Sequence, residues 1–308
     1  MMSIWQIKTC RKELPRPQSG NWTCDESSDA SDCLKITGNE RMNSITRQQW
    51  QTFESEGYLR LGRIGSDKIL QAMRQRIDEI MLGKADLDYD RMLMQLDSND
   101  GDYDSAGEQT RGHKGATLNY RKIQLLERDP VFLAYMQLPI FAEAASHFYG
   151  DMPVAAFRAM FMNKPAGRGT VLPLHQDRWR ALDRDPELTI YTALDDADRE
   201  NGCIEIIPGT QHKILNPDHP SGFLTAEMAL QFENDTRRIP LILEAGEVVL
   251  LNPWTLHGSG INHTNRPRRA FSVCLMDART MSLRYKRLAS RSIIFGEGAM
   301  KLPQSLFT

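Results

Sequence analysis

Short runs of β-forming residues fill the chain from residue 152 onward, and they restrict its fold more than any other feature. Glycine, proline and asparagine turns separate these runs, and no long helical pattern intervenes. Because parallel sheets need helical crossovers between their strands, this spacing argues against a doubly wound fold and favours a sandwich or jelly roll. The runs are MPVAAFRAMFMN, LTIYTALDD, CIEIIPG, IPLILEAG, EVVLLN and RAFSVCLMD.

Helical patterns precede this β-rich half. Residues 46–57 have the spacing of a capping box, and residues 66–83 carry an apolar stripe with a serine before it and a glycine after it. Two more helices are expected at residues 129–137 and 138–150, and the polar, acidic segment 84–118 is expected to form a solvated loop or lid. The sequence therefore predicts an α+β protein with N-terminal and flanking helices around a β core.

The first part of the chain has a different amino-acid composition. Residues 1–42 are rich in proline, glycine, serine and aspartate and show no apolar periodicity. This composition predicts a disordered N-terminal tail. Residues 43–308 are then expected to form a single domain, which is long enough to bury a core.

Composition excludes several functional classes. A formal net charge of -2 provides no basic field for nucleic acid, and no apolar run has the length of a membrane span. The N-terminus lacks the apolar core of a secretory signal. The 5 cysteines form no CxxC pair, which argues against a zinc ribbon or a disulfide framework and favours a cytoplasmic location.

His175 and Asp177 stand two residues apart in the segment VLPLHQDRW. Side chains two apart point to the same side of an extended segment, so both could bind one metal ion. The triplet alone has little weight, because roughly 0.5 His-x-Asp triplets are expected by chance in a chain of this composition. A second, distant histidine is needed to give it meaning.

His257 provides that second histidine. It lies between an expected strand and a loop of small residues in the segment EVVLLNPWTLHGSG. Loops at strand ends are where a β scaffold presents ligands. Two histidines and one carboxylate make the facial triad of non-haem iron(II) oxygenases, which leaves coordination positions open for a co-substrate and O2.

Arg268 follows at the start of the next expected strand. Its planar guanidinium can form two hydrogen bonds with a carboxylate, such as the free carboxylate of 2-oxoglutarate. Arg269 is its neighbour and must face the other way. Arg268 shares its face with small or weakly polar residues that leave room for a ligand, so Arg268 is the better candidate.

Several segments together resemble the phytanoyl-CoA dioxygenase family. They are LHQD, NGCIEIIPGT, GEVVLLNPWTLHGSGINHT, the arginine at 268, and ESEGYLRL and RKIQLLERDPVF ahead of the core. The resemblance extends from about residue 44 to 277. It implies a double-stranded β-helix, which is a jelly-roll or cupin-like fold, and an Fe(II)- and 2-oxoglutarate-dependent oxygenase that also uses O2.

The resemblance also implies roles for individual residues. His175, Asp177 and His257 match the iron ligands. Arg268 matches the arginine that anchors 2-oxoglutarate, and Ser259 matches a hydroxyl that assists it. The other positions that match the co-substrate pocket are Lys122, Met160, Gln176 and Tyr191.

This sequence departs from the family pattern at two positions. Tyr191 stands where close relatives often carry tryptophan, a change that keeps an aromatic ring and adds a hydroxyl. Gln211 occupies the usual histidine position of the PGTH turn, which removes support for a role of His212. Asp177 keeps the carboxylate that related halogenases lack, so halogenation is disfavoured.

The expected reaction is hydroxylation of an unactivated C–H bond in a small molecule, with release of succinate and CO2. Arg168, Arg178 and Arg180 are expected near the pocket mouth and favour an anionic substrate. Two alternatives remain open at this point: a metal-dependent cupin-type isomerase that uses no 2-oxoglutarate, and a binding protein that has lost turnover. The sequence specifies no oligomeric state.

Overall fold

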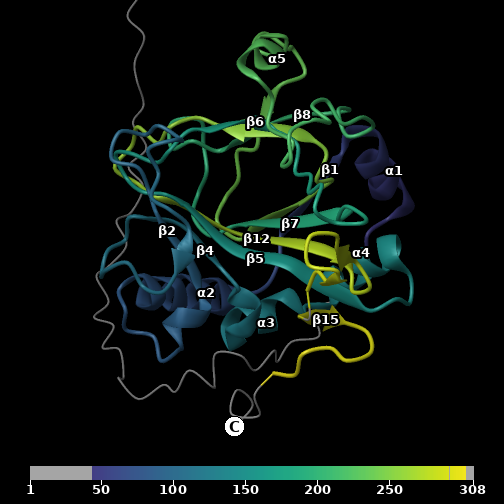
Figure 1. Ribbon diagram of the computed structural model, residues 1–308, viewed down its shortest axis with the longest axis horizontal. Coiled ribbons are helices and arrows are strands. Elements are labelled where there is room, and N and C mark those ends of the chain that lie inside the picture. The colour runs from purple at the N-terminus through teal and green to yellow at the C-terminus, as the bar shows by residue number, and fades with distance from the viewer. Residues whose placement is uncertain (1–43, 291, 303–308) are drawn as a thin grey trace, which may run out of the picture.

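The computed structural model describes residues 44–290 and 292–302 (Figure 1). The expected N-terminal tail lies outside the described residues. The helices are α1 (Arg47–Glu56), α2 (Asp67–Met81), α3 (Pro130–Met136), α4 (Pro139–Tyr149), α5 (Ala226–Leu230) and the 3-10 helices η2 (Tyr89–Arg91) and η3 (Leu126–Arg128). The strands are β1 (Tyr58–Arg63), β2 (Leu93–Leu96), β3 (Thr110–Arg111), β4 (Tyr120–Gln124), β5 (Val154–Lys164), β6 (Leu172–His175), β7 (Leu188–Ala193), β8 (Ile204–Ile207), β9 (Ile239–Pro240), β10 (Glu247–Leu251), β11 (Leu256–Ser259), β12 (Arg268–Asp277), β13 (Met281–Ser282), β14 (Arg287–Leu288) and β15 (Ile293–Phe295).

Two antiparallel sheets face each other. The larger has the order β1-β10-β7-β12-β5-β4-β2-β3, with β15 also paired to β5, and the smaller has the order β6-β11-β8-β9. From β5 to β8, and again from β10 to β12, each strand lies in the opposite sheet from the one before it. This winding is the jelly roll, or double-stranded β-helix, that the sequence predicts.

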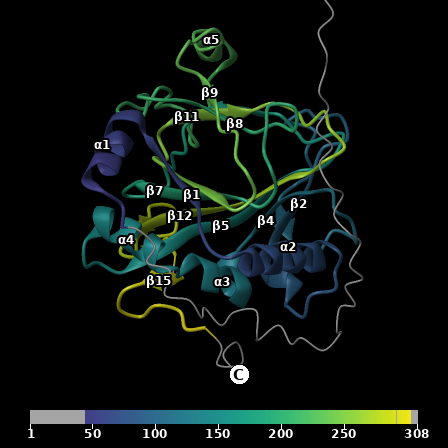
Figure 2. The same ribbon diagram turned by 180° about the vertical axis from the view of Figure 1, so that it is seen from behind.

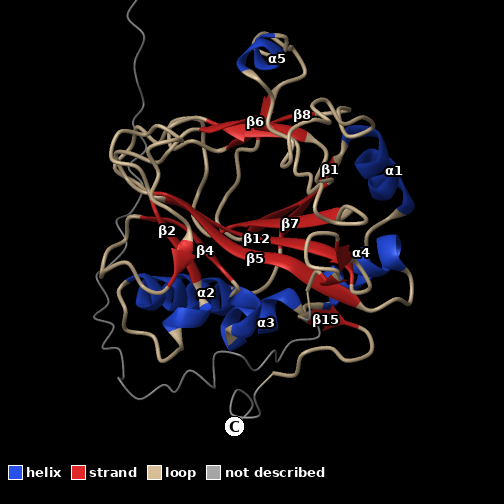
Figure 3. Cartoon of the chain, viewed as in Figure 1, coloured by secondary structure: helices blue, strands red, loops and turns tan. Residues whose placement is uncertain are grey.

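Helices cover the outer face of the larger sheet. Figures 1 and 3 show α2 and α3 beneath β4 and β5, while the smaller sheet lies on the opposite side and carries the projecting α5. The reverse view shows β8, β9 and β11 of the smaller sheet above β7 and β12 (Figure 2). Among the described residues, none of the helices combines the length and the hydropathy that a bilayer span requires.

Strand β12 shows how one strand serves both layers. Phe271, Val273 and Leu275 belong to the core that also contains the helices, whereas Ala270 belongs to the core between the two sheets. Arg269 shares the helix side, where it forms ion pairs with Asp195 and with Asp78 of α2. Arg268 therefore points between the sheets, into the interior of the jelly roll.

Three expectations from the sequence differ from the structure. The small residues Gly258 and Ser259, expected in a loop after His257, belong to strand β11. The segment 84–118 is not one loop, because it supplies β2 and β3 to the larger sheet and buries Asp97 and Ser98. The expected strand at 239–246 contributes only the two residues of β9. The expected helices are present as α1 to α4, and the capping box of Thr46 and Gln49 starts α1.

Replacing Phe271 with alanine should destabilise the fold by about 3–5 kcal/mol, because it leaves a cavity in a closely packed core. The ring is fully buried and lies 4.8 Å from the ring of Phe132 between centroids. Urea unfolding measures the change. Leu230→Ala is the control, since Leu230 is 66% exposed and its loss should leave stability within about 0.5 kcal/mol of the starting protein. Equal stability of the two variants would contradict this account of the core.

Candidate functional site

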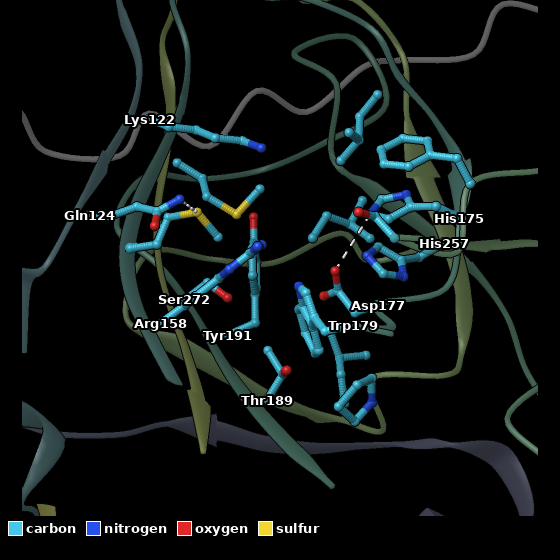
Figure 4. A pocket seen from close by; sticks show the side chains of 18 of the residues that line it. Lys122, Gln124, Arg158, His175, Asp177, Trp179, Thr189, Tyr191, His257 and Ser272 are labelled. Atoms are coloured by element: carbon cyan, nitrogen blue, oxygen red, sulfur yellow. Dashed lines mark hydrogen bonds and ion pairs between the residues drawn. The ribbon is translucent and has the colours of Figure 1, made fainter. Parts of the chain in front are cut away.

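A cavity of ≈ 240 Å³ lies between the two sheets (Figure 4). Its walls come from β4, β5, β7, β10 and β12 of the larger sheet and from β6, β8 and β11 of the smaller sheet. His175, Asp177 and His257 lie together on one wall, and Lys122, Arg158 and Tyr191 lie across from them. The cavity thus brings charged side chains from distant parts of the chain into one enclosed space.

His175, Asp177 and His257 can offer three ligand atoms to one metal ion. These atoms all lie within 4.8 Å of one another, and the Nε2 atom of His175 is 3.9 Å from a carboxylate oxygen of Asp177. The two histidines are cross-strand neighbours in β6 and β11, which places their ring centroids 4.2 Å apart. Pairing of two short strands therefore brings the distant histidine to the His-x-Asp motif.

Both histidine rings are oriented by backbone carbonyl groups. Nδ1 of His175 lies 2.9 Å from the oxygen of Pro173, and Nδ1 of His257 lies 2.8 Å from the oxygen of Thr255. A carbonyl oxygen only accepts, so each Nδ1 carries the proton and each Nε2 keeps a free lone pair. Burial, with a smaller contribution from His257, lowers the pKa of His175 to about 3, so His175 is neutral at physiological pH, as a metal ligand must be.

The backbone between His175 and Asp177 is held in place by contacts on the side away from the cavity. The side-chain amide of Gln176 donates to the carbonyl oxygens of Thr210, Lys213 and Trp254. Gly222 packs against the same segment in the left-handed region, with φ +74, and an added Cβ would lie 2.0 Å from the carbonyl oxygen of Gln176. Any side chain at this position would displace the loop that carries His175 and Asp177.

A smaller recess adjoins the cavity and shares Lys122, Met162 and Leu172 with it. Ser259 and Arg268 line this recess, and Arg268 donates a hydrogen bond of 2.9 Å to the hydroxyl of Tyr191. Among the described residues, the buried Oγ of Ser259 and Nε of Arg268 have no hydrogen-bond partner. Buried polar atoms are almost always paired, so these two indicate a place for a ligand with polar atoms.

Positive charge exceeds negative charge around this recess. Arg121, Lys122, Lys164 and Arg268 all line it, and none of the four forms an ion pair with a carboxylate in the described part of the chain. Burial, together with Arg121, lowers the pKa of Lys122 to about 7. Burial, together with Arg268, lowers the pKa of Lys164 to about 6. An anionic ligand would relieve this repulsion.

The pKa of Lys164 has a consequence for stability. The pKa of Lys164 in the folded protein lies below the ordinary value of 10.5. Between about pH 6 and 10.5 the unfolded chain therefore binds a proton at Lys164 that the folded protein does not hold. The free energy of unfolding rises with pH in this window. From pH 7 to pH 9 the native protein should gain about 3 kcal/mol relative to a Lys164→Met variant. Urea unfolding of both proteins at the two pH values measures this difference. Identical pH profiles would show that Lys164 stays protonated in the fold.

The structure brings most of the residues expected from the sequence to one place. The residues that line the cavity or its recess are His175, Asp177, His257, Lys122, Met160, Tyr191, Ser259 and Arg268. Gln176 is the exception, because a residue between two cavity-facing neighbours points the opposite way. Its side chain braces neighbouring loops and does not line the cavity.

The three arginines expected at the pocket mouth are absent from the cavity wall. Arg168 donates to the side chain of Asn99, while Arg178 and Arg180 donate to backbone carbonyls of the loop at 217–218. Their guanidinium groups therefore stabilise surface loops. Arg158 of β5, which no sequence motif singled out, lines the cavity in their place.

Solved structures with the same fold include two enzymes. The non-haem α-ketoglutarate-dependent carbocyclase SnoK aligns with a TM-score of 0.60 and 17% identity, over 78% of this chain and 88% of SnoK. EctD from S. alaskensis, in a structure with 2-oxoglutarate and 5-hydroxyectoine, aligns with a TM-score of 0.60 and 18% identity, over 87% of this chain and 85% of EctD. These similarities confirm the double-stranded β-helix.

A His, Asp, His cluster inside this fold is the arrangement of non-haem iron oxygenases. The family model for phytanoyl-CoA dioxygenase (PhyH) matches residues 53–270, and the chain belongs to this family. Peroxisomal phytanoyl-CoA dioxygenase of Rattus norvegicus is 28% identical over 240 residues, which cover 75% of this chain and 68% of the rat protein. A probable phytanoyl-CoA dioxygenase of Caenorhabditis elegans is also 28% identical, over 74% of each chain. Family membership confirms the enzyme class that the sequence predicts, a dioxygenase.

Proposed function

We propose that this protein is an Fe(II)- and 2-oxoglutarate-dependent dioxygenase that hydroxylates an unactivated C–H bond of a small molecule and releases succinate and CO2. Residues 43–308 form its catalytic domain, and the protein acts in the cytoplasm. The observation that carries the proposal is the cluster of His175, Asp177 and His257, whose ligand atoms all lie within 4.8 Å of one another.

His175 and His257 would hold the iron through Nε2, and Asp177 through its carboxylate. The donor set suits Fe(II), because imidazole binds it well and one carboxylate offsets part of its charge. The carbonyl groups of Pro173 and Thr255 keep both rings in the metal-binding tautomer. When bound, the iron with 2-oxoglutarate supplies the oxidising chemistry, while the protein orients the reactants and keeps the cavity dry.

Arg268 would bind the free carboxylate of 2-oxoglutarate, assisted by the hydroxyl of Ser259. In the described part of the chain, both side chains have a buried polar atom without a hydrogen-bond partner, and the hydroxyl of Tyr191 orients the guanidinium. Lys122 lines both the recess and the cavity, and Met160 lines the cavity. The excess of buried positive charge fits a dianion better than it fits a neutral co-substrate. This charge, with Arg268 and Ser259, disfavours an isomerase that uses no 2-oxoglutarate.

The substrate is a small, anionic molecule. A cavity of ≈ 240 Å³ is below the range of about 300–1,000 Å³ typical of sites for drug-sized ligands, and the co-substrate must share it. The names of the mammalian relatives indicate an acyl-CoA ester, whereas the EctD structure, which contains 5-hydroxyectoine, indicates a small hydroxylated molecule. The size of the cavity favours a compact molecule of the second kind.

Anaerobic addition of Fe(II) and 2-oxoglutarate tests the proposal. Chelation of iron by 2-oxoglutarate should produce a metal-to-ligand charge-transfer band, and succinate should form only when O2 and a substrate are supplied. Binding of Fe(II) without the band would favour the isomerase. Formation of the band without succinate release across a broad metabolite panel would favour a binding protein that has lost turnover.

A further inference from the structure

Arg158 is a cationic side chain that lines the cavity but has no role in the proposed co-substrate site. It lies on β5, where Arg158, Met160 and Met162 alternate with outward residues and line the cavity. Figure 4 shows it on the wall across from Asp177 and His257. We propose that Arg158 binds an anionic group of the primary substrate and thereby selects small organic acids; this inference rests on the function proposed above.

The guanidinium of Arg158 is held in place by aromatic rings. Its Cζ atom lies 5.0 Å from the ring centroid of Trp179 and 5.3 Å from that of Phe157, and these two rings contact each other edge-on at 4.8 Å. Cation–π contacts of this kind stabilise a guanidinium beside aromatic rings. The N–H groups of a guanidinium form a planar fork that a carboxylate can accept through two hydrogen bonds.

No protein group in the described part of the chain uses those N–H groups. Arg158 has no ion pair and no side-chain hydrogen bond there, whereas Arg178 and Arg180 each donate to a carbonyl oxygen and Arg268 donates to Tyr191. Arg158 is half-buried and lines the cavity, so its N–H groups can donate to an acceptor that a ligand supplies. Arg158 is therefore placed as a ligand-binding group, and the three loop arginines are not.

Arg158 lies far from the arginine that serves the co-substrate. In the register of β5 and β12, Arg158 is opposite Cys274, whereas Arg268 is opposite Lys164. Six residues of strand separate the two positions, which corresponds to about 20 Å between Cα atoms. Arg158 stacks on Trp179, two residues beyond Asp177, while Arg268 is held by Tyr191. The cavity thus offers two anion-binding positions, one for each reactant.

The surroundings of Arg158 indicate what kind of acid fits. Trp179 and Met160 supply apolar surface, and Gln124 and Thr189 supply polar groups on the same cavity wall. Arg158 also helps to lower the pKa of Lys122, so the positive charges of the cavity repel each other until an anion enters. A compact carboxylate or phosphonate with an apolar body matches this combination of charge, surface and volume.

The test is calorimetric binding to anaerobic protein loaded with Fe(II) and 2-oxoglutarate. The probes are linear and aryl-substituted carboxylates of two to ten carbons, the matching phosphonates, and the primary amide of each acid as an uncharged partner. The proteins are the native chain, Arg158→Met, Arg158→Lys, and Arg180→Met as a control with the same loss of charge on a nearby loop. Loss of a charge-assisted, bidentate contact should weaken acid binding by on the order of 100-fold in Arg158→Met.

The inference is supported if acids bind the native protein and Arg180→Met with equal affinity and bind better than their amides. Their affinity should fall about 100-fold in Arg158→Met and be partly restored in Arg158→Lys. The relative affinity of carboxylates and phosphonates then identifies the acid group. The inference is overturned if no acid prefers the native protein over Arg158→Met, or if Arg158→Met weakens 2-oxoglutarate binding and leaves acid binding intact. A native protein that forms no charge-transfer band with Fe(II) and 2-oxoglutarate would instead overturn the proposed function, whatever Arg158 does.

Discussion

Asp177→Ala should abolish succinate formation and weaken Fe(II) binding by at least about 100-fold, because loss of groups that merely orient metal ligands already costs 10- to 100-fold. The variant leaves His175 and His257 in place but removes the carboxylate that offsets the metal charge. Metal content after dialysis against Fe(II), measured by elemental analysis, gives a result that does not depend on knowing the substrate. Succinate release in the presence of O2 gives the second measurement.

The matched control is Asp218→Ala, which changes an exposed aspartate on a loop outside the cavity wall. It should bind Fe(II) as the native protein does. Circular dichroism shows whether both variants are folded, which is expected because the side chain of Asp177 is 30% exposed and supports no core packing. If Asp177→Ala bound Fe(II) and released succinate like the native protein, the carboxylate would lie outside the metal site and the proposed triad would be wrong.

The fold could be predicted because its signals are local. Alternating apolar residues fix which side of β12 faces the helices, and this alternation also directs Arg268 inward and Arg269 toward Asp195. Strands β6 and β11 were harder to predict. Each has four residues, one contains Pro173 and the other Gly258, and both owe their conformation to pairing with distant partners.

The site and its surroundings could be predicted less completely, as Gln176, Arg158 and Asp97 show. The orientation of Gln176 follows from alternation alone, since it stands between two residues that face the cavity. The alternation of β5 also predicts that Arg158 faces the same side as Met160. Its role in the site, however, depends on the contact with Trp179, which comes from another segment. The burial of Asp97 likewise depends on Thr170, which hydrogen bonds with it across the fold. Such contacts form only after the sheets are assembled.

Arg268→Met should raise the dissociation constant of 2-oxoglutarate by on the order of 100-fold, because a bidentate contact between a guanidinium and a carboxylate is lost. Arg268→Lys should fall between the native protein and Arg268→Met, since lysine keeps the charge but not the planar fork. Titration of 2-oxoglutarate into anaerobic, Fe(II)-loaded protein, followed by the charge-transfer band, measures the affinity without any primary substrate.

Arg269→Met is the decisive comparison, because it removes the same charge from the adjacent residue of the same strand. Arg269 faces the helices and pairs with Asp195 and Asp78, so its loss should lower stability and leave the affinity for 2-oxoglutarate unchanged. A nonspecific effect of charge would affect both variants equally, whereas a pocket on one face of β12 separates them. If Arg269→Met weakened 2-oxoglutarate binding as much as Arg268→Met, the recess beside Ser259 could not be the co-substrate site, and the Nε of Arg268, which has no partner among the described residues, would need another ligand.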